Sequence, residues 1–340
     1  MTPRLALIIG RIAQALPALL GVVVISFLLT RALPGDPAAY FAGPAATPES
    51  IAQIRASMGF DRSLPEQFVH YLGALMAGDL GQSLSTGQPV AEELARRLPA
   101  SLELTLSALL LSCALALPLG VLAATRQGSV WDHGCRALVT AGVSLPTFFT
   151  GIVLVYVFYY LLGWAPSPIG RLDFAYLSPP EVTGFFVPDA LLDGDLQTAW
   201  GALRQLVLPA ITLALFTMAP IARMSRGAML AALSSDYIRT ARATGLSRVQ
   251  TVYGYALRNA LLPVITTLSM VFSFTLGANV LVEKVFAWPG IGSFAIEALV
   301  VSDYAAVQGF VLAMAILFVL LNLLVDLVYT LIDPRMRQAR

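Results

Sequence analysis

Long apolar segments alternate with polar ones along the whole chain, and six of the apolar segments reach about twenty residues. A helix of about 20 residues crosses the bilayer's hydrocarbon core, which is about 30 Å thick. Lipid offers the backbone no hydrogen bonds, which favours helices because they satisfy their own polar groups. The pattern therefore predicts an all-α membrane protein with a single membrane domain over residues 1–340 and six transmembrane helices. The predicted spans cover residues 9–30, 101–124, 136–162, 204–224, 263–284 and 306–330.

The composition and the placement of charges support a membrane protein and predict its orientation. Charged residues make up 12% of the chain and hydrophobic residues 57%, whereas soluble domains carry about 25% charged residues. Of the 21 lysines and arginines, 13 fall on one side of the predicted spans. Because short cytoplasmic loops are enriched in basic residues, we predict that both termini are cytoplasmic. The 13 residues are Arg4, Arg11, Arg126, Arg136, Arg223, Arg226, Arg239, Arg242, Arg248, Arg258, Arg335, Arg337 and Arg340.

The first loop outside the membrane, residues 32–99, is predicted to be a helical elaboration on the periplasmic or extracellular side. Its serine, threonine, proline and glycine residues have the spacing of helix starts and stops. The expected helices lie between Thr47 and Gly59, between Ser63 and Gly78, and over residues 89–97.

The sequence also predicts the character of one outside loop and of the third span. The outside loop 164–203 is rich in proline, glycine and aspartate, which predicts little regular structure. The third span contains Pro146, and we expect a kink there that a helix bundle in lipid tolerates.

The polar segment before the fifth span is predicted to form two short helices joined by a sharp turn. Ser235 or Asp236 caps the first helix, where an acidic side chain also complements the helix dipole. Gly245 follows the last turn, at a position that favours glycine because the backbone becomes left-handed. Ser247 and Gln250 match a capping box at the start of the second helix.

This cytoplasmic segment, residues 234–262, has the residue types expected at a docking site for a soluble protein. Its first helix carries small residues, which let another backbone approach closely, flanked by tyrosine and arginine, which are enriched in interface hot spots. An amphipathic helix on the anionic leaflet shows a similar pattern, but such a helix needs no corner between two caps. The predicted docking residues are Asp236, Tyr237, Arg239, Thr240, Ala241, Arg242, Ala243, Thr244, Gly245 and Leu246.

The sequence lacks the side-chain patterns of a catalytic or metal centre. A P-loop requires glycines followed by lysine and serine or threonine, whereas the one lysine of this chain, Lys284, precedes Val285. Cys113 and Cys135 are expected to remain unpaired as small apolar residues, and the two histidines lie in different loops. We therefore predict no catalytic residue, no metal ligand and no cofactor bound by this chain.

The cytoplasmic segment also carries a family motif. Ala241-Arg242-Ala243, then Gly245, and later Leu262-Pro263 resemble the EAA loop of binding-protein-dependent ABC importer permeases, in particular the dipeptide/oligopeptide/nickel branch. The leading glutamate and the alanine at the second position of the general motif are absent. The large first outside loop and the short N-terminal tail resemble the first of the two permease subunits. Further matches occur in order at Leu33–Pro37, Gly78–Gly81 with Ser83, Gly87–Val90, Arg97–Ser101, Phe286–Gly292 and Asp333–Arg335.

The resemblance implies half of a heterodimeric pore in the bacterial cytoplasmic (inner) membrane. The implied partners are a second homologous permease subunit, two ABC ATPase subunits and an extracytoplasmic substrate-binding protein, with no nucleic acid. ATP and Mg would bind the ATPase subunits, and the cytoplasmic segment would transmit their motion to the fourth and fifth spans. Di- or oligopeptides are the expected substrate, with nickel chelates and glutathione as alternatives.

Two groups of polar or rigid residues are further candidates. Ser269, Ser273, Thr275 and Asn279 of the fifth span would contact substrate, or would instead form ordinary hydrogen bonds between helices. Trp288, Pro289 and Gly290 form an outside turn that would touch the binding protein or the pore mouth. Alternatively, this turn is a connector at the membrane interface, where tryptophan is common.

Two other classes of membrane protein compete with an ATP-driven importer. An ion-gradient-driven transporter or channel tends to place ionisable groups at mid-membrane, whereas these spans are nearly free of charge apart from Asp326 and residues near their edges, such as Glu103. A scaffold or receptor would need no continuous polar path. Transport without an ATPase would favour the first class, and failure of a reconstituted complex to accumulate substrate would favour the second.

Overall fold

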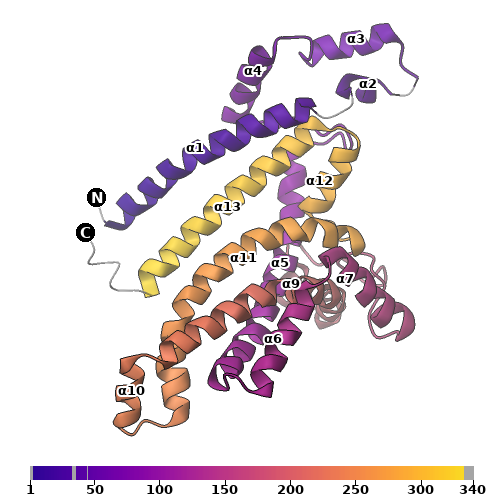
Figure 1. The fold of residues 1–340 in the computed structure, drawn as a ribbon. Coiled ribbons are helices and arrows are strands. Elements are labelled where there is room, and N and C mark those ends of the chain that lie inside the picture. The colour runs from indigo at the N-terminus through magenta and orange to yellow at the C-terminus, as the bar shows by residue number, and fades with distance from the viewer. Residues whose placement is uncertain (1–2, 33–35, 44, 333–340) are drawn as a thin grey trace. The chain divides into compact units, whose positions relative to one another are not determined.

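The computed structural model describes residues 3–32, 36–43 and 45–332, and within these ranges it contains helices and an isolated β-bridge but no β-strand (Figure 1). The structure therefore confirms an all-helical protein. The chain divides into two compact units, residues 1–99 with 290–323 and residues 100–289 with 324–340, which are described separately. The motif residues Leu33–Gly35 and Asp333–Arg335 lie outside the described ranges.

In the first unit, capping residues start the helices of the outside loop as the sequence predicts. The Thr47 hydroxyl accepts the Ser50 backbone N–H at 3.3 Å, and the Glu66 side chain accepts that of Ser63 at 3.1 Å. The helices of this unit are α1 (Pro3–Ala32), α2 (Pro37–Ala42), α3 (Pro48–Ser57), α4 (Leu64–Met76), α12 (Ile291–Val300), the first turns of α5 (Val90–Thr125) and most of α13 (Tyr304–Ile332).

The core of the first unit forms where α5 meets α12 and α13. Val90 and Leu94 are buried with Phe294 in one apolar cluster. The Gln308 side chain donates to the Thr30 hydroxyl at 2.9 Å, and this bond joins α13 to α1, which run side by side in Figure 1. These contacts make the outside loop and its flanking helices one packed body.

The second unit is built around α9, which packs against α5 and α11. Leu213 of α9, Leu104 of α5 and Val282 of α11 are fully buried in the same cluster. The elements of this unit are the rest of α5, then α6 (Val130–Val143), α7 (Thr147–Leu154), the π-helix η1 (Val155–Leu161), α8 (Phe186–Leu192), α9 (Leu196–Leu233), α10 (Asp236–Ala243), the π-helix η2 (Gln250–Ala256) and α11 (Leu257–Val285).

Four described helices are long and apolar enough to cross a bilayer: α5, α9, η2 with α11, and α13. The pair formed by α6 and α7–η1 is a fifth candidate, and α1 contributes the apolar stretch Leu16–Ala32. Six spans with both termini in the cytoplasm therefore remain a prediction.

The third predicted span is broken rather than kinked. Between Val143 and Thr147 the chain bends by 97°, and Pro146 caps α7 with an extended backbone at ψ 141°. The residue before a proline disfavours the helical conformation, so Leu145 cannot easily continue α6.

Two loop predictions are also corrected. Residues 89–97 are not a separate helix, because α5 runs without interruption through Pro99. The loop 164–203 is more ordered than its composition indicates: it contains α8, and α9 begins at Leu196.

Candidate functional site

The predicted docking helix forms as α10 and connects two long helices along the chain. The helix before it is α9, with 38 residues, and the helix after it is η2 with α11, with 36 residues. Pro263 lies inside α11, so the second helix of the segment continues without a break into the helix predicted as the fifth span. The α10 segment is therefore attached directly to the ends of two span-length helices.

The turn after α10 has the hydrogen bonds that define a Schellman motif. Gly245 adopts φ +85°, and its N–H donates to the Arg242 carbonyl at 3.1 Å. The Leu246 N–H donates to the Ala241 carbonyl at 3.2 Å. The end of α10 is thus fixed by two backbone bonds that depend on a left-handed residue at position 245.

The second helix starts with the predicted capping box. The Ser247 N–H donates to Gln250 Oε1 at 3.0 Å, and the Gln250 N–H donates to Ser247 Oγ at 3.3 Å. Two backbone donors at the helix start are thereby satisfied reciprocally. Only about two residues separate the two caps, so the segment is a tight corner.

One face of α10 is anchored to the body of the second unit. Ile238 is fully buried in a cluster with Val121 of α5, Met229 of α9 and Val252 of η2, and Ala241 on the same helix is also buried. Burying an isoleucine side chain stabilises the packed state by roughly 1.5–3 kcal/mol. The corner is therefore held against three other elements.

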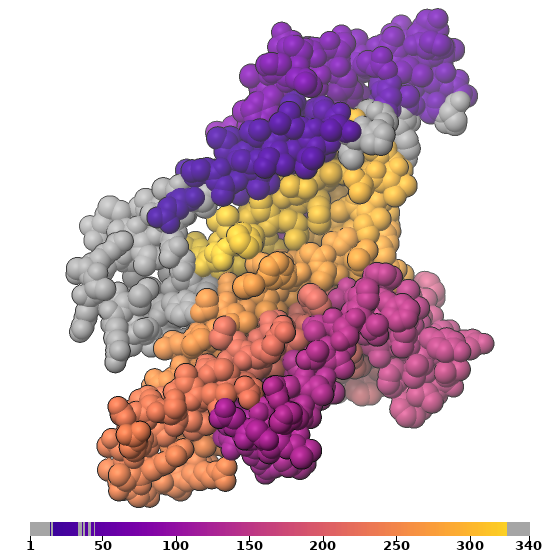
Figure 2. All heavy atoms as spheres, in the orientation of Figure 1, coloured from indigo at the N-terminus to yellow at the C-terminus, as the bar shows by residue number. Residues whose placement is uncertain are grey.

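The opposite face of α10 is exposed and forms one end of the second unit (Figure 2, orange). Tyr237 is 41% exposed, and the exposed ion pair between Arg239 and Asp236 at 3.2 Å contributes little stability. The predicted small-residue strip is divided, because Ala241 points inward. Its other members and most of the remaining predicted docking residues are exposed: Thr240, Arg242, Ala243, Thr244 and Gly245.

A partly buried ion pair that was not expected from the sequence ties α6 to α9. Arg226 donates from Nε to Asp132 Oδ1 at 2.8 Å and from Nη2 to Asp132 Oδ2 at 2.7 Å. The Gly128 N–H also donates to Asp132, whose side chain is nearly fully buried. The one available signal was Asp132 itself, a lone acidic residue in the stretch between Arg126 and Arg136.

We expect Asp132→Asn to destabilise the second unit by about 1.5–3 kcal/mol, because charge-assisted hydrogen bonds to Arg226 are lost. A thermal unfolding series with Arg226→Gln and the double variant measures the coupling. The double variant is expected to be more stable than the sum of the single losses indicates. Additive losses would show that the two side chains do not act as a pair.

Comparison with known proteins shows where this arrangement belongs. Residues 116–338 match the family described as binding-protein-dependent transport system inner membrane component, and residues 4–105 match the N-terminal family of such components. The probable D,D-dipeptide transport system permease protein DdpB of Escherichia coli is 45% identical over 316 residues, which cover 93% of this chain and 92% of that protein. The chain belongs to this family of transport-system inner membrane components. It is thus a multi-pass transport component of the inner membrane and not an enzyme.

Other relatives and solved structures agree with this assignment. The di/tripeptide transport system permease protein DppB of Pseudomonas aeruginosa is 42% identical over 337 residues, covering 99% of this permease and 100% of that protein. Two inward-facing structures of the MetNI methionine ABC transporter superpose with TM-scores of 0.53 and 0.50 at 18% and 19% identity, over 71% of this chain and 96% of theirs. At that identity the likeness shows a shared fold.

The four polar residues predicted for the substrate path lie at different depths in the permease. Thr275 is fully buried and bonds to the Val271 carbonyl of its own helix at 2.6 Å, whereas Ser269 and Ser273 are half-buried. Asn279 is buried and donates to the Ser101 carbonyl of α5 at 3.3 Å. In this conformation Asn279 thus bridges two spans.

The predicted outside turn is anchored by its tryptophan. Trp288 is 1% exposed, and its Nε1 donates to the Ala100 carbonyl at 2.9 Å. The turn begins at Ala287, which has φ +50° although it is not glycine. Pro289 is exposed and Gly290 is buried, so Pro289 is the one of these three residues that lies on the protein surface.

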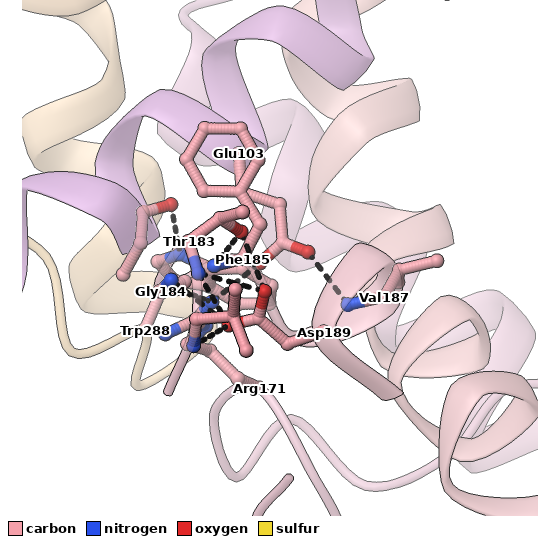
Figure 3. A network of polar contacts seen from close by, with 10 residues as sticks. Glu103, Arg171, Thr183, Gly184, Phe185, Val187, Asp189 and Trp288 are labelled. Atoms are coloured by element: carbon pink, nitrogen blue, oxygen red, sulfur yellow. Dashed lines mark hydrogen bonds and ion pairs between the residues drawn. The ribbon is translucent and has the colours of Figure 1, made fainter. Parts of the chain in front are cut away.

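The loop between η1 and α9 contains a buried polar network (Figure 3). Arg171 Nη2 pairs with Glu103 Oε2 at 2.6 Å and donates to the Gly184 carbonyl at 2.7 Å, while its guanidinium stacks on the Phe186 ring at 3.6 Å. The Val187 N–H donates to Glu103 Oε1 at 3.0 Å. The loop is thereby fastened to α5.

Asp189 organises the other half of the same loop. The Thr183 hydroxyl donates to it at 2.6 Å, and the N–H groups of Val182, Thr183 and Gly184 donate at 2.9–3.2 Å. Burial alone would raise the pKa of the Asp189 carboxyl, but these hydrogen bonds outweigh it and hold the pKa below its usual value of about 3.9.

We expect acid to loosen this loop. Because the pKa of Asp189 is lower in the folded state than in the unfolded one, its contribution to stability is present above a pH of about 3.9 and lost below it. Hydrogen exchange of residues 182–189 should therefore accelerate as the pH falls below that value, after correction for the intrinsic pH dependence of exchange. Asp189→Asn should show fast exchange already at neutral pH, and the exposed Asp193→Asn serves as control. Equal exchange in the two variants would contradict this role.

Proposed function

We propose that this permease forms half of the pore of an ATP-driven importer for di- or oligopeptides. The observation that carries the coupling role is the doubly capped corner of α10, which is buried on one face, exposed on the other and joined to two span-length helices. The substrate class is supported by relatives named as dipeptide or di/tripeptide permeases at 38–45% identity.

The proposed assembly places six spans in the membrane with both termini in the cytoplasm. A second homologous permease completes the pore, two ABC ATPase subunits bind ATP and Mg, and an extracytoplasmic binding protein delivers substrate. The basic residues near α10 support the cytoplasmic placement of this corner, since arginine-rich short loops stay inside.

Mechanical coupling follows from the attachment of α10. When the ATPase subunits close, the surface that holds the exposed face of α10 moves. The buried contacts of Ile238 make α10 move together with the ends of α9, α5 and η2. Motion is thus passed to the spans as a rigid-body rotation that opens the pore outward.

The substrate path is proposed to run along α11, past Ser269, Ser273, Thr275 and Asn279. One observation supports Asn279: its Oδ1 atom is buried and has no hydrogen-bond partner among the described residues. Such an acceptor is available to a peptide N–H when the spans separate. The outside turn Trp288, Pro289 and Gly290 is proposed to meet the binding protein through the exposed Pro289.

The test uses the reconstituted complex with its ATPase subunits and binding protein, and it measures dipeptide uptake and ATP hydrolysis together. Arg242→Glu reverses a charge on the exposed face, so we expect uptake to fall about tenfold or more while membrane insertion is unchanged. Arg258→Glu, an equal charge change outside α10, is the matched control. Wild-type uptake by the Arg242→Glu variant would overturn the docking role, and uptake without ATPase subunits would overturn the ATP-driven mechanism.

A further inference from the structure

A pocket of about 310 Å³ lies between α5, α6 and α9 of the second unit, and none of the docking residues of α10 lines it. Its apolar wall includes Leu119, Ala123 and Val139. Arg136 and Arg223 line it as well, and both are exposed. The pocket therefore joins an apolar wall to two accessible cationic side chains.

The positive charge around the pocket exceeds the negative charge beside it. Asp132 is held by Arg226, a third arginine of the wall, through hydrogen bonds of 2.8 and 2.7 Å, and Arg136 lies 3.6 Å from the same carboxylate. Arg223 forms no ion pair among the residues that the structure describes. One carboxylate thus faces three guanidinium groups, and this excess of positive charge attracts an anion.

The depth of the pocket follows from the way α6 lies along α9. Near the start of α6, Asp132 bonds to Arg226, and near its end a Cβ built on Gly142 would lie 2.8 Å from the Leu215 carbonyl. As the chain advances on α6, its contacts move back along α9, so the two helices run antiparallel. The part of α6 that lines the pocket, between residues 135 and 140, therefore lies beside the last turns of the predicted fourth span.

The cationic and apolar parts of the pocket lie at different depths of the predicted membrane. Arg223 is next to the end of the fourth span at residue 224, whereas Leu119 lies five residues before the end of the second span at residue 124, about 7.5 Å further in. The arginines are thus at headgroup level, and the apolar wall extends into the hydrocarbon. A soluble partner would have to enter the lipid to fill this wall, whereas a phospholipid places its phosphate and its acyl chain at these two depths.

The size of the pocket also suits an acyl chain. One turn of a helix about 10 Å wide occupies roughly 420 Å³, so a transmembrane helix of a second permease does not fit into about 310 Å³. A methylene group is similar in size to a water molecule, which occupies about 30 Å³ in the liquid. The pocket therefore holds about ten such groups, which is part of one acyl chain.

We propose that this pocket binds one anionic phospholipid of the cytoplasmic leaflet. Arg136 and Arg223 donate hydrogen bonds to its phosphate oxygens, and an acyl chain lies against Leu119, Ala123 and Val139. Arg226 stays with Asp132 and keeps α6 in place as the third wall of the pocket. The inference rests on the proposed function only for which side of the membrane is cytoplasmic.

The first experiment removes the charge of the pocket. Native mass spectrometry measures the phosphatidylglycerol retained by the full-length chain, released from nanodiscs of phosphatidylcholine with a minor fraction of phosphatidylglycerol. Each arginine near a headgroup strengthens binding about fivefold, so Arg136→Gln/Arg223→Gln should retain this lipid about 30-fold more weakly. Arg258→Gln, which removes an exposed arginine outside the pocket, should retain it like the wild type. The charge-conserving Arg136→Lys/Arg223→Lys variant should recover most of the binding, which shows that the fold is intact.

The second experiment fills the apolar part of the pocket and leaves its charge unchanged. Thr140 is an exposed residue of the pocket wall, and Ala137 is an exposed residue of the same helix outside it. Thr140→Trp should weaken retention about fourfold for each methylene group that it keeps out, whereas Ala137→Trp should have no effect.

Loss of phosphatidylglycerol in both the glutamine double variant and Thr140→Trp, with retention in both controls, supports the proposal. Equal retention in the glutamine double variant and Arg258→Gln would overturn it, as would displacement of the lipid by inorganic phosphate. Unchanged retention in Thr140→Trp would overturn it too, because the lipid would then lie on the surface and not in the pocket. Lipid retained by the chain alone but absent from its complex with a second permease would show that a protein covers the pocket, and would also overturn it. Retention by the chain alone does not depend on transport, so failure of the proposed function is seen separately.

Discussion

Replacing Gly245 with proline is expected to abolish coupled uptake while the chain still inserts into the membrane. Gly245 has φ +85°, whereas proline is restricted to about −65°, and proline also lacks the N–H that bonds to the Arg242 carbonyl. The Schellman turn therefore cannot form. A turn destabilised by more than about 1.4 kcal/mol adopts its docked geometry less than a tenth as often. Uptake and substrate-stimulated ATP hydrolysis should both fall by at least that factor.

Graded substitutions at the same position test the physical reason. No atom lies within 4 Å of a Cβ built on Gly245, so alanine meets only the conformational cost of a left-handed backbone, about 1–2 kcal/mol. Asparagine tolerates this conformation best after glycine. Coupled uptake should therefore decrease in the order glycine, asparagine, alanine, proline. A proline variant that transports like the wild type would show that the corner of α10 does not transmit motion to the spans.

The parts of the fold that depend on residues close together in the sequence could be predicted from it. The corner of α10 depends on Gly245, Ser247 and Gln250, whose effects act within one helical turn, and it forms as expected. The start of α3 at Thr47 has the same local origin. The spans follow from apolar length alone, although length cannot tell a straight helix from one that breaks at Pro146.

The features that the sequence analysis missed depend on residues far apart in the chain. Asp132 and Arg226 are separated by 94 positions, and Glu103 and Arg171 by 68, so no local pattern marks either pair. Pro99 lies inside α5 because apolar contacts on both sides of it hold the helix, with Leu94 buried before it and Leu104 after it. The role of the exposed face of α10 is likewise not visible in the chain alone, because it depends on a partner.

Removing one member of the Glu103–Arg171 pair should strongly destabilise the second unit. The side chains are 4% and 7% exposed, so either charge left alone would be buried without compensation. Breaking such a pair costs about 3–5 kcal/mol, and we expect Arg171→Met to destabilise the second unit by that amount. The loss of stacking on Phe186 adds to it. Thermal unfolding of the purified permease measures the change.

The double variant Glu103→Leu/Arg171→Met distinguishes a charge effect from a packing effect. Without the carboxylate no buried charge remains, so the double variant should be more stable than Arg171→Met alone, even though the Val187 N–H loses its acceptor. Glu103→Gln should be milder than Arg171→Met, because glutamine still accepts hydrogen bonds from Arg171 and Val187. If the loss of stability in the double variant instead equalled the sum of the losses caused by the two single substitutions, the loop would be held by packing on Phe186 and not by the ion pair. In that case hydrogen exchange would accelerate around Phe186 in every Arg171 variant and remain unchanged in Glu103→Gln.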